Sequence, residues 1–350
     1  MLSYRRRLQC RARRWRLRFF LRLRRLCRWS LCKLRALAVR KHLVIATRGS
    51  QLALWQAHFI RDSLCRLHPE LAIELSVIKT RGDIILDVPL AKVGGKGLFV
   101  KEIEDALLDG RADLAVHSIK DVPMFLPEGL LLGCVPKRED PRDALLSVRY
   151  ASLEALPMGA HVGTSSLRRQ AQLLHLRPDL HVSSLRGNVD TRLRKLREGV
   201  YDAILLASAG LSRLGLEVPQ RQDLAAQVFL PAVGQGALGI ECREDDYDLL
   251  CLLAELEDGA SRVCVEAERA FLAELDGGCQ VPIAGHATLL EGEQLLLQGL
   301  VGEVDGTRLI KASRQGHTSE AEALGRELAR ELLDSGARAI LAKLYQTEEK

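Results

Sequence analysis

Arginine stands beside serine, threonine or asparagine at three places where a strand is expected to be followed by a helix, in segments 47–50, 163–169 and 185–192. Helix N-termini attract anions, and an arginine fork can hold a carboxylate with two parallel hydrogen bonds. One such junction could hold solvated or locally paired arginines. Three such junctions favour a site for several carboxylates or phosphates. The site is not a nucleotide-binding phosphate loop, because the motifs G-x-x-x-x-G-K-[ST] and G-x-G-x-x-G are absent.

Two other segments carry side chains that could react. Lys120 and Asp121 directly follow an expected strand over 112–118. Such a dipeptide is usually a surface ion pair, but a carboxylate at a strand end facing the arginines could stabilise a cation or move a proton. Cys279 follows two glycines. A lone cysteine is more often a small buried apolar residue than a nucleophile, although the glycines permit close approach of backbone or ligand.

The hydrophobic pattern supplies a scaffold for these residues. Up to about residue 211, short apolar runs alternate with longer runs of helical periodicity, which predicts mostly parallel sheets with helices on both faces. Ligands bind such sheets beyond the carboxyl ends of the strands, where the arginine segments would meet. The expected strands are 43–47, 73–79, 112–118, 161–163, 181–185 and 203–207, and the expected helices are 50–67, 101–108, 167–176 and 189–197.

The pattern changes after residue 237. One or two helices over 246–275 are followed by strands at 283–287, 294–301 and 307–313 and by a helix over 319–333. Strands grouped before a helix are typical of a small α+β domain. Pro141, Pro231 and the Gly-Gln-Gly of 234–236 mark expected crossings between domains.

The net charge of +6 comes from the start of the chain. Residues 1–41 hold 16 Lys and Arg and no acid, so the other 35 basic and 45 acidic residues give 42–350 a net charge of −10. An acidic body argues against a nucleic-acid partner. The leader could be a transit peptide, a basic amphipathic helix that touches a membrane or RNA, or a stretch that is not translated, and it lacks the apolar run of a membrane span.

The nine cysteines and nine histidines show no metal-binding spacing, so no metal is expected. An odd number of cysteines without a C-x-x-C pair also argues against a disulfide framework. These features are typical of a protein in the reducing cytoplasm.

Seven segments together resemble those of the porphobilinogen deaminase family, in the family's order and spacing, over about 43–341. Two positions depart from the family pattern. Ala284 stands where glycine commonly follows Pro-Ile, and Ala260 stands where threonine is expected. The matching segments are 81–83, 93–99, 117–123, 163–169, 186–196, 230–236 and 277–283.

The resemblance implies an α/β protein with two periplasmic-binding-protein-like lobes, built on mixed, mostly parallel sheets, plus a small C-terminal α+β domain. Residues 1–41 would form a basic leader that is disordered or not translated. The domains would be 42–140 with 236–256 for the first, 141–235 for the second, and 257–350 for the third, which carries the cofactor cysteine.

The resemblance also implies a transferase, a hydroxymethylbilane synthase of tetrapyrrole (haem) biosynthesis. It would condense four porphobilinogen molecules head to tail, with release of ammonia, on a dipyrromethane primer that a thioether joins to Cys279. Porphobilinogen would be the small-molecule partner. The chain is expected to be a cytoplasmic monomer without a nucleic-acid or membrane partner.

The same resemblance assigns roles to individual residues. Asp121 would be the catalytic carboxylate with Lys120 beside it, and Lys96 and Phe99 would belong to a lid in the Gly-rich segment 92–101. Substrate carboxylates are expected at Arg48, Ser50, Arg186 and Arg213. The residues expected to hold the cofactor are Cys279, Ser118, Lys120, Thr164, Ser166, Arg168, Arg169 and Arg192.

Two rival functions remain. A solute-binding protein of the same two-lobed fold would carry no covalent primer, so the intact mass of the protein distinguishes it. An RNA- or membrane-associated protein would depend on the basic leader, so deletion of the leader distinguishes that one.

Overall fold

The computed structural model describes residues 40–80, 82, 100–277 and 281–348, with side chains up to 344. Nearly all of the leader therefore lies outside the described residues, as do Lys96, Phe99 and Cys279. Among the helices that are described, none is both long and apolar enough to cross a membrane.

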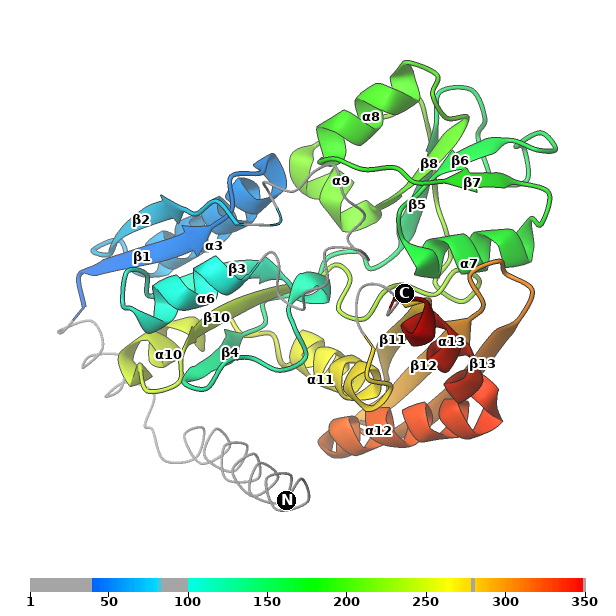
Figure 1. Cartoon of the computed structure of the whole chain (residues 1–350). Coiled ribbons are helices and arrows are strands. Elements are labelled where there is room, and N and C mark those ends of the chain that lie inside the picture. Colours follow the sequence, from blue (N-terminus) through cyan, green and yellow to red (C-terminus); the bar gives the residue numbers. More distant parts are fainter. Residues whose placement is uncertain (1–39, 81, 83–99, 278–280, 349–350) are drawn as a thin grey trace.

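The first lobe is a five-stranded sheet in the order β2-β1-β3-β10-β4, in which only β10 is antiparallel to its neighbours (Figure 1). Alternate residues of β1 face opposite sides of the sheet. Ile45 packs with α3 and α10, and Ala46 packs with α6. The elements are β1 (His42–Thr47), β2 (Ala72–Val77), β3 (Leu114–Ser118), β4 (Leu130–Cys134), β10 (Leu238–Arg243), α3 (Gln51–Leu67), α6 (Lys101–Leu108) and α10 (Tyr247–Leu253).

The second lobe repeats this plan in the order β7-β6-β8-β5-β9, with β5 as the antiparallel strand. Leu205 of β8 packs with α7 on one face, and Leu206 packs with α8 on the other. The elements are β5 (Asp143–Ser147), β6 (His161–Gly163), β7 (His181–Ser183), β8 (Ala203–Ala207), β9 (Gln220–Asp223), α7 (Leu167–Leu176), α8 (Val189–Arg197) and α9 (Ser208–Leu214).

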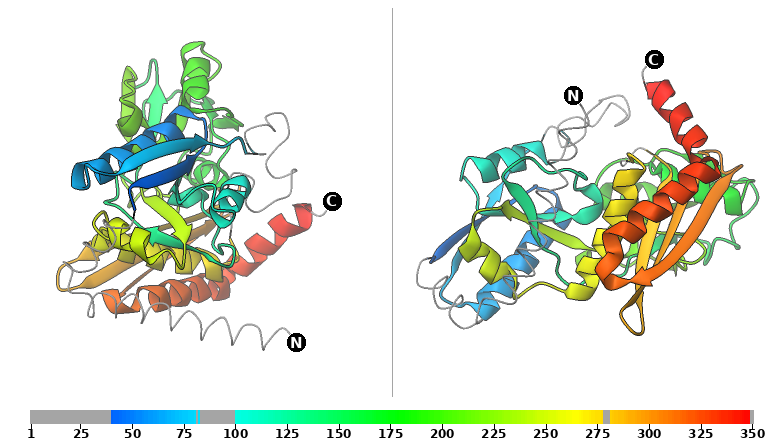
Figure 2. Two further views of the ribbon diagram at one scale, coloured as in Figure 1. Left: turned by 90° about the vertical axis from the view of Figure 1, so that its left-hand side faces the viewer. Right: turned by 90° about the horizontal axis from the view of Figure 1, so that it is seen from below.

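The third sheet is an antiparallel meander, β11-β12-β13, that packs with α11 and α12 (Figures 1 and 2). Phe271 of α11 lies so close to the sheet that a Cβ at Gly299 would be 2.7 Å from its ring. The elements are β11 (Ile283–Leu290), β12 (Gln294–Gly302), β13 (Leu309–His317), α11 (Gly259–Glu274), α12 (Ala321–Leu332) and α13 (Arg338–Glu348), with short turns η1 (Ile119–Asp121), η2 (Thr318–Glu320) and η3 (Leu333–Ala337).

The predicted fold class is confirmed by these three sheets: two are mixed and mostly parallel, and the third belongs to an α+β unit. The stretch 246–275 is two helices, and the final predicted helix begins at Ala321 after η2. The chain enters the second sheet with β5 and returns to the first with β10. The predicted domain boundaries stay a prediction.

Four of the described cysteines are free thiols: Cys65, Cys134, Cys242 and Cys264. Cys251 in α10 is disulfide-bonded. The expected absence of a disulfide framework stays a prediction.

Candidate active site

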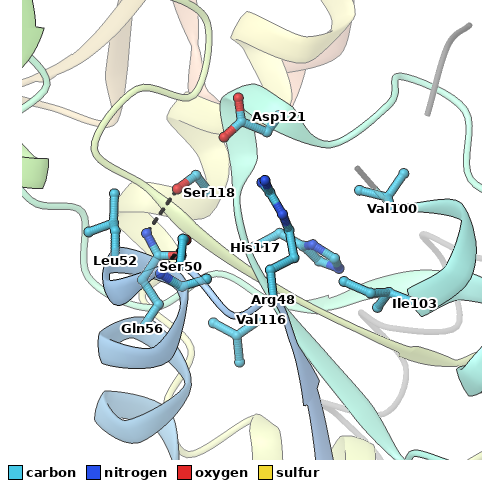
Figure 3. A pocket seen from close by; sticks show the side chains of 11 residues that line it. Arg48, Ser50, Leu52, Gln56, Val100, Ile103, Val116, His117, Ser118 and Asp121 are labelled. Atoms are coloured by element: carbon cyan, nitrogen blue, oxygen red, sulfur yellow. Dashed lines mark hydrogen bonds between the residues drawn. The ribbon is translucent and has the colours of Figure 1, made fainter. Parts of the chain in front are cut away.

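A pocket opens at the carboxyl ends of β1 and β3, which are parallel neighbours (Figure 3). Arg48 and Ser50 follow β1, while Ser118 ends β3 and Asp121 follows it, and all four side chains line the pocket. The Ser50 Oγ caps α3 by accepting a hydrogen bond from a backbone N–H, as expected for a strand-to-helix junction. Gln56 donates to the Ser118 hydroxyl at 2.9 Å and so fixes it.

Asp121 lies in the turn η1, and in Figure 3 the Arg48 side chain points toward it. The Asp121 side chain is exposed. A buried carboxylate would stabilise a nearby cation more strongly, but Asp121 is accessible to solvent in the protein alone. Strong charge stabilisation at Asp121 requires a bound ligand that excludes water.

Lys120 points from the same turn toward the second lobe. Its Nζ lies 3.5 Å from the Gln235 Oε1. Burial lowers the pKa of Lys120 to about 8, and the charges of Arg169 and Arg168 add to the shift, whereas Asp121 and Asp143 oppose it. Lys120 thus lies within electrostatic reach of both predicted cofactor-binding arginines of α7.

Arg168 and Arg169 are buried and bind Asp143, the first residue of β5. Arg168 donates to both carboxylate oxygens at 2.6 and 3.2 Å, and Arg169 donates to one of them at 2.7 and 2.9 Å. Burial would raise the pKa of Asp143, but these arginines and a hydrogen bond from Gln235 hold it well below its usual range. The arginines therefore have a protein carboxylate as partner, and their expected contact with a cofactor stays a prediction.

The hydroxyl groups of the 163–169 segment bind the local backbone. Thr164 is buried and accepts a hydrogen bond from the Ser166 N–H at 3.2 Å. Ser166 in turn caps α7 by accepting from the Arg169 N–H. The junction is the helix start that the sequence predicted, and both hydroxyls already take part in its hydrogen bonds.

Arg192 stands in the first turns of α8 and faces the same region. Its Nε donates to the Gly187 carbonyl at 2.8 Å. Burial, Arg169 and Arg186 lower the pKa of Arg192 to about 10, whereas Asp121 raises it. Arg192 thus lies within electrostatic reach of both Asp121 and Arg186.

Arg213 lies elsewhere, where α9 of the second lobe meets α3 of the first. Its guanidinium lies 5.9 Å from the ring centre of Trp55, and Nη2 donates to the Gly236 carbonyl at 2.7 Å. Burial lowers the pKa of Arg213 to about 10, against the charge of Glu139. These contacts link the lobes, and the predicted binding of substrate by Arg213 stays a prediction.

The described residues thus bring together two groups of predicted site residues. Arg48, Ser50, Ser118 and Asp121 share the pocket. The second group is linked by electrostatic interactions that shift the pKa values of its members. It consists of five cations and two carboxylates: Lys120, Arg168, Arg169, Arg186, Arg192, Asp121 and Asp143. Asp143 was not among the site residues predicted from the sequence, and Gln235 was noted only within an expected domain crossing and a segment that resembles the family. The only signal for Asp143 was its place two residues after Pro141.

The described residues form two α/β lobes of similar topology and a third, α+β unit, and loops of both lobes bring cations within electrostatic reach of one another. The model of the porphobilinogen deaminase dipyromethane cofactor binding domain matches residues 43–250, and that of the porphobilinogen deaminase C-terminal domain matches residues 262–334. The chain belongs to the porphobilinogen deaminase family, the hydroxymethylbilane synthase transferases of tetrapyrrole biosynthesis.

Curated relatives agree with this. The porphobilinogen deaminase of Nitratidesulfovibrio vulgaris strain DP4 is 63% identical over 306 residues, which are 87% of this chain and 97% of the relative. That of strain Miyazaki F is 62% identical over 313 residues, 88% of this chain and 99% of the relative.

Solved structures with some similarity include two binding proteins. A probable amino-acid ABC transporter extracellular-binding protein of Bacillus subtilis has a TM-score of 0.38 and 11% identity, over 62% of this chain and 90% of that one. The aliphatic sulphonate binding protein of Escherichia coli has a TM-score of 0.37 and 14% identity, over 67% and 71%. Such low scores add nothing to what the sheets themselves show.

Proposed function

We propose that this chain carries a dipyrromethane primer on Cys279 and extends it with four porphobilinogen molecules to hydroxymethylbilane, releasing one ammonia at each addition. The observation that carries the proposal is an excess of positive charge. Among the described residues, two carboxylates, Asp121 and Asp143, lie within electrostatic reach of members of a group of five cations, and these seven groups carry a net charge of +3. The five cations are Lys120, Arg168, Arg169, Arg186 and Arg192.

This charge excess fits a dipyrromethane, whose acetate and propionate side chains are carboxylates. Burial lowers the pKa values of Lys120 and Arg192 because their charged forms have lost contact with water. Carboxylates of a bound primer would offset this loss by pairing with the two cations. When bound, the primer supplies the terminal pyrrole carbon that forms each new bond. Arg48 and Arg186 would hold carboxylates of the growing chain and of the incoming porphobilinogen.

Asp121 would stabilise the positive charge that develops when porphobilinogen loses ammonia. The departure of ammonia leaves an electron-poor azafulvenium, and a carboxylate that accepts hydrogen bonds from pyrrole N–H groups lowers its energy. The primer, when bound, would supply the carbon that joins this cation, and the new ring would then have one proton to lose. The Asp121 carboxylate, which lines the pocket, can accept that proton.

The direct test of the proposed function is turnover by the purified full chain. Porphobilinogen should disappear with release of one ammonia for each molecule consumed, and hydroxymethylbilane should form. Binding of porphobilinogen without ammonia release would instead favour a solute-binding protein. The expected cytoplasmic location and monomeric state stay predictions.

The activity is expected to fall as the pH rises through about 8. The pKa of Lys120 is lowered to about 8, so its ammonium loses its proton above that pH and no longer compensates nearby carboxylates. Lys120→Arg keeps a positive charge to much higher pH. In profiles of kcat against pH, the fall in kcat at alkaline pH should therefore occur at a higher pH in this variant than in the wild type. A fall at the same pH in both proteins would show that the Lys120 ammonium does not set it.

Deletion of residues 1–39 is expected to leave kcat within about twofold of the full chain, because the two family matches lie within 43–334. The deletion retains Arg40, whose Nη1 donates to Asp246 at 2.9 Å. Loss of deaminase activity, with the melting temperature unchanged, would show that the basic leader takes part in catalysis.

A further inference from the structure

Gln235 joins the two connections between the lobes. It lies between β9 and β10 and is 1% exposed. Its Nε2 donates to the carbonyl of Pro141, in the connection between β4 and β5, at 2.7 Å, and to the Asp143 Oδ1 at 3.0 Å. The other end of the amide, Oε1, faces the Lys120 ammonium at 3.5 Å. The neutral side chain of Gln235 thus links Lys120, in the turn η1, to Asp143, the carboxylate that binds Arg168 and Arg169.

The backbone around Gln235 is held from the third domain. Arg138 donates through Nε to the Gln235 carbonyl at 2.9 Å, and it also binds Glu268 of α11. Glu268 accepts a hydrogen bond from the Gly234 N–H at 2.6 Å. At Gly236, where φ is +85°, a Cβ would lie 2.4 Å from a backbone oxygen, so only glycine fits the close approach of the two connections. The backbone at Gln235 is therefore held in place, while the side-chain amide is oriented by its own contacts with Pro141, Asp143 and Lys120.

An amide suits this position because it can donate and accept at opposite ends. Among the described residues, the charged groups that act on Lys120 are Asp121 on its own turn, Asp143 on β5, and Arg168 and Arg169 on α7. Gln235 adds an acceptor for the ammonium without adding charge, and its donor end faces the Asp143 carboxylate.

We propose that Gln235 is a positioning residue, whose amide holds the Lys120 ammonium between Asp121 and the Asp143–Arg168–Arg169 cluster while it ties the two lobe connections together. The inference rests on the proposed function, since it concerns how Lys120 is held for that reaction. Gln235 itself need not touch substrate.

The test compares Gln235→Met with Gln172→Met. Gln172 is a matched control because it is also buried and also binds a lobe connection, through the Leu230 N–H at 2.7 Å and the Leu230 carbonyl at 3.0 Å. Gln235→Met should lower kcat about tenfold and move the alkaline limb of the pH profile downward, because the ammonium loses an acceptor. Gln172→Met should leave the position of the limb unchanged.

A double-mutant cycle with Lys120→Met separates positioning from general damage. If Gln235 acts through Lys120, the double variant Gln235→Met/Lys120→Met should be no slower than Lys120→Met alone. The proposal would be overturned if the loss of kcat in the double variant equals the product of the losses in the two single variants. It would also be overturned if kcat of Gln235→Met falls at the same alkaline pH as in the wild type. Should Gln235→Met fail to fold, Gln235→Asn keeps both amide groups on a shorter chain and serves in the same cycle. Absence of turnover in the wild-type protein would contradict the proposed function instead.

Discussion

Replacing Asp121 by alanine is expected to lower kcat by about a thousandfold, with the protein still folded. The carboxylate is the one acidic side chain that lines the described pocket, and it lies within electrostatic reach of Arg192 and Lys120. Its loss removes the negative charge that would stabilise the cation left when ammonia departs. Because Asp121 is exposed, its removal should cost little folding stability. Rates of ammonia release and melting temperatures of both proteins measure the two effects.

Asp109→Ala is the matched control for this loss. Asp109 is an exposed aspartate of the same lobe at the end of α6, where it pairs with Arg111 at 3.2 Å. Its removal should leave kcat unchanged. Turnover by Asp121→Ala at the rate of Asp109→Ala would remove Asp121 from the proposed mechanism.

Replacing Asp143 by alanine is expected to lower the free energy of unfolding by about 3–5 kcal/mol, because two buried guanidinium groups would lose their only carboxylate partner in the described structure. The pKa of Asp143 is held below its usual range, so its stabilising contribution is present above the unfolded pKa and is lost as pH falls through the folded pKa. Denaturant unfolding at neutral pH measures the loss.

Asp179→Ala provides the comparison within the second lobe. Asp179 pairs with Arg177 at 2.7 Å near the surface, where water screens the charges, so its removal should destabilise the protein far less than removal of Asp143. If the two variants unfold at the same denaturant concentration, the Asp143 cluster does not stabilise the lobe as the buried contacts indicate.

The local parts of the site could be predicted from the sequence. Ser50, Ser166 and Asn188 each cap a helix that follows a strand, and every cap bonds to a backbone N–H three residues along the chain. Such contacts depend on neighbouring residues, so residue type and spacing suffice to find them. The strands and helices that carry the arginine segments were predictable for the same reason.

Contacts between distant segments could not be predicted in this way. Asp143 meets Arg168 25 residues further on, and Gln235 meets Lys120 across 115 residues, so neither pair has a local signature. The antiparallel strands β5 and β10 escaped prediction, and each pairs with a strand distant in the sequence, β5 with β8 and β10 with β3. The position of Arg213 on Trp55 also depends on how the lobes pack.

The covalent primer on Cys279 is the central claim, and the intact mass of the purified full chain tests it most directly. The wild-type mass should exceed that of the polypeptide by two porphobilinogen units less their two ammonia molecules, and fragmentation should place the addition on Cys279. Cys279→Ala should have the bare polypeptide mass and no turnover. A wild-type protein that converts porphobilinogen while its mass equals that of the bare polypeptide would contradict the account.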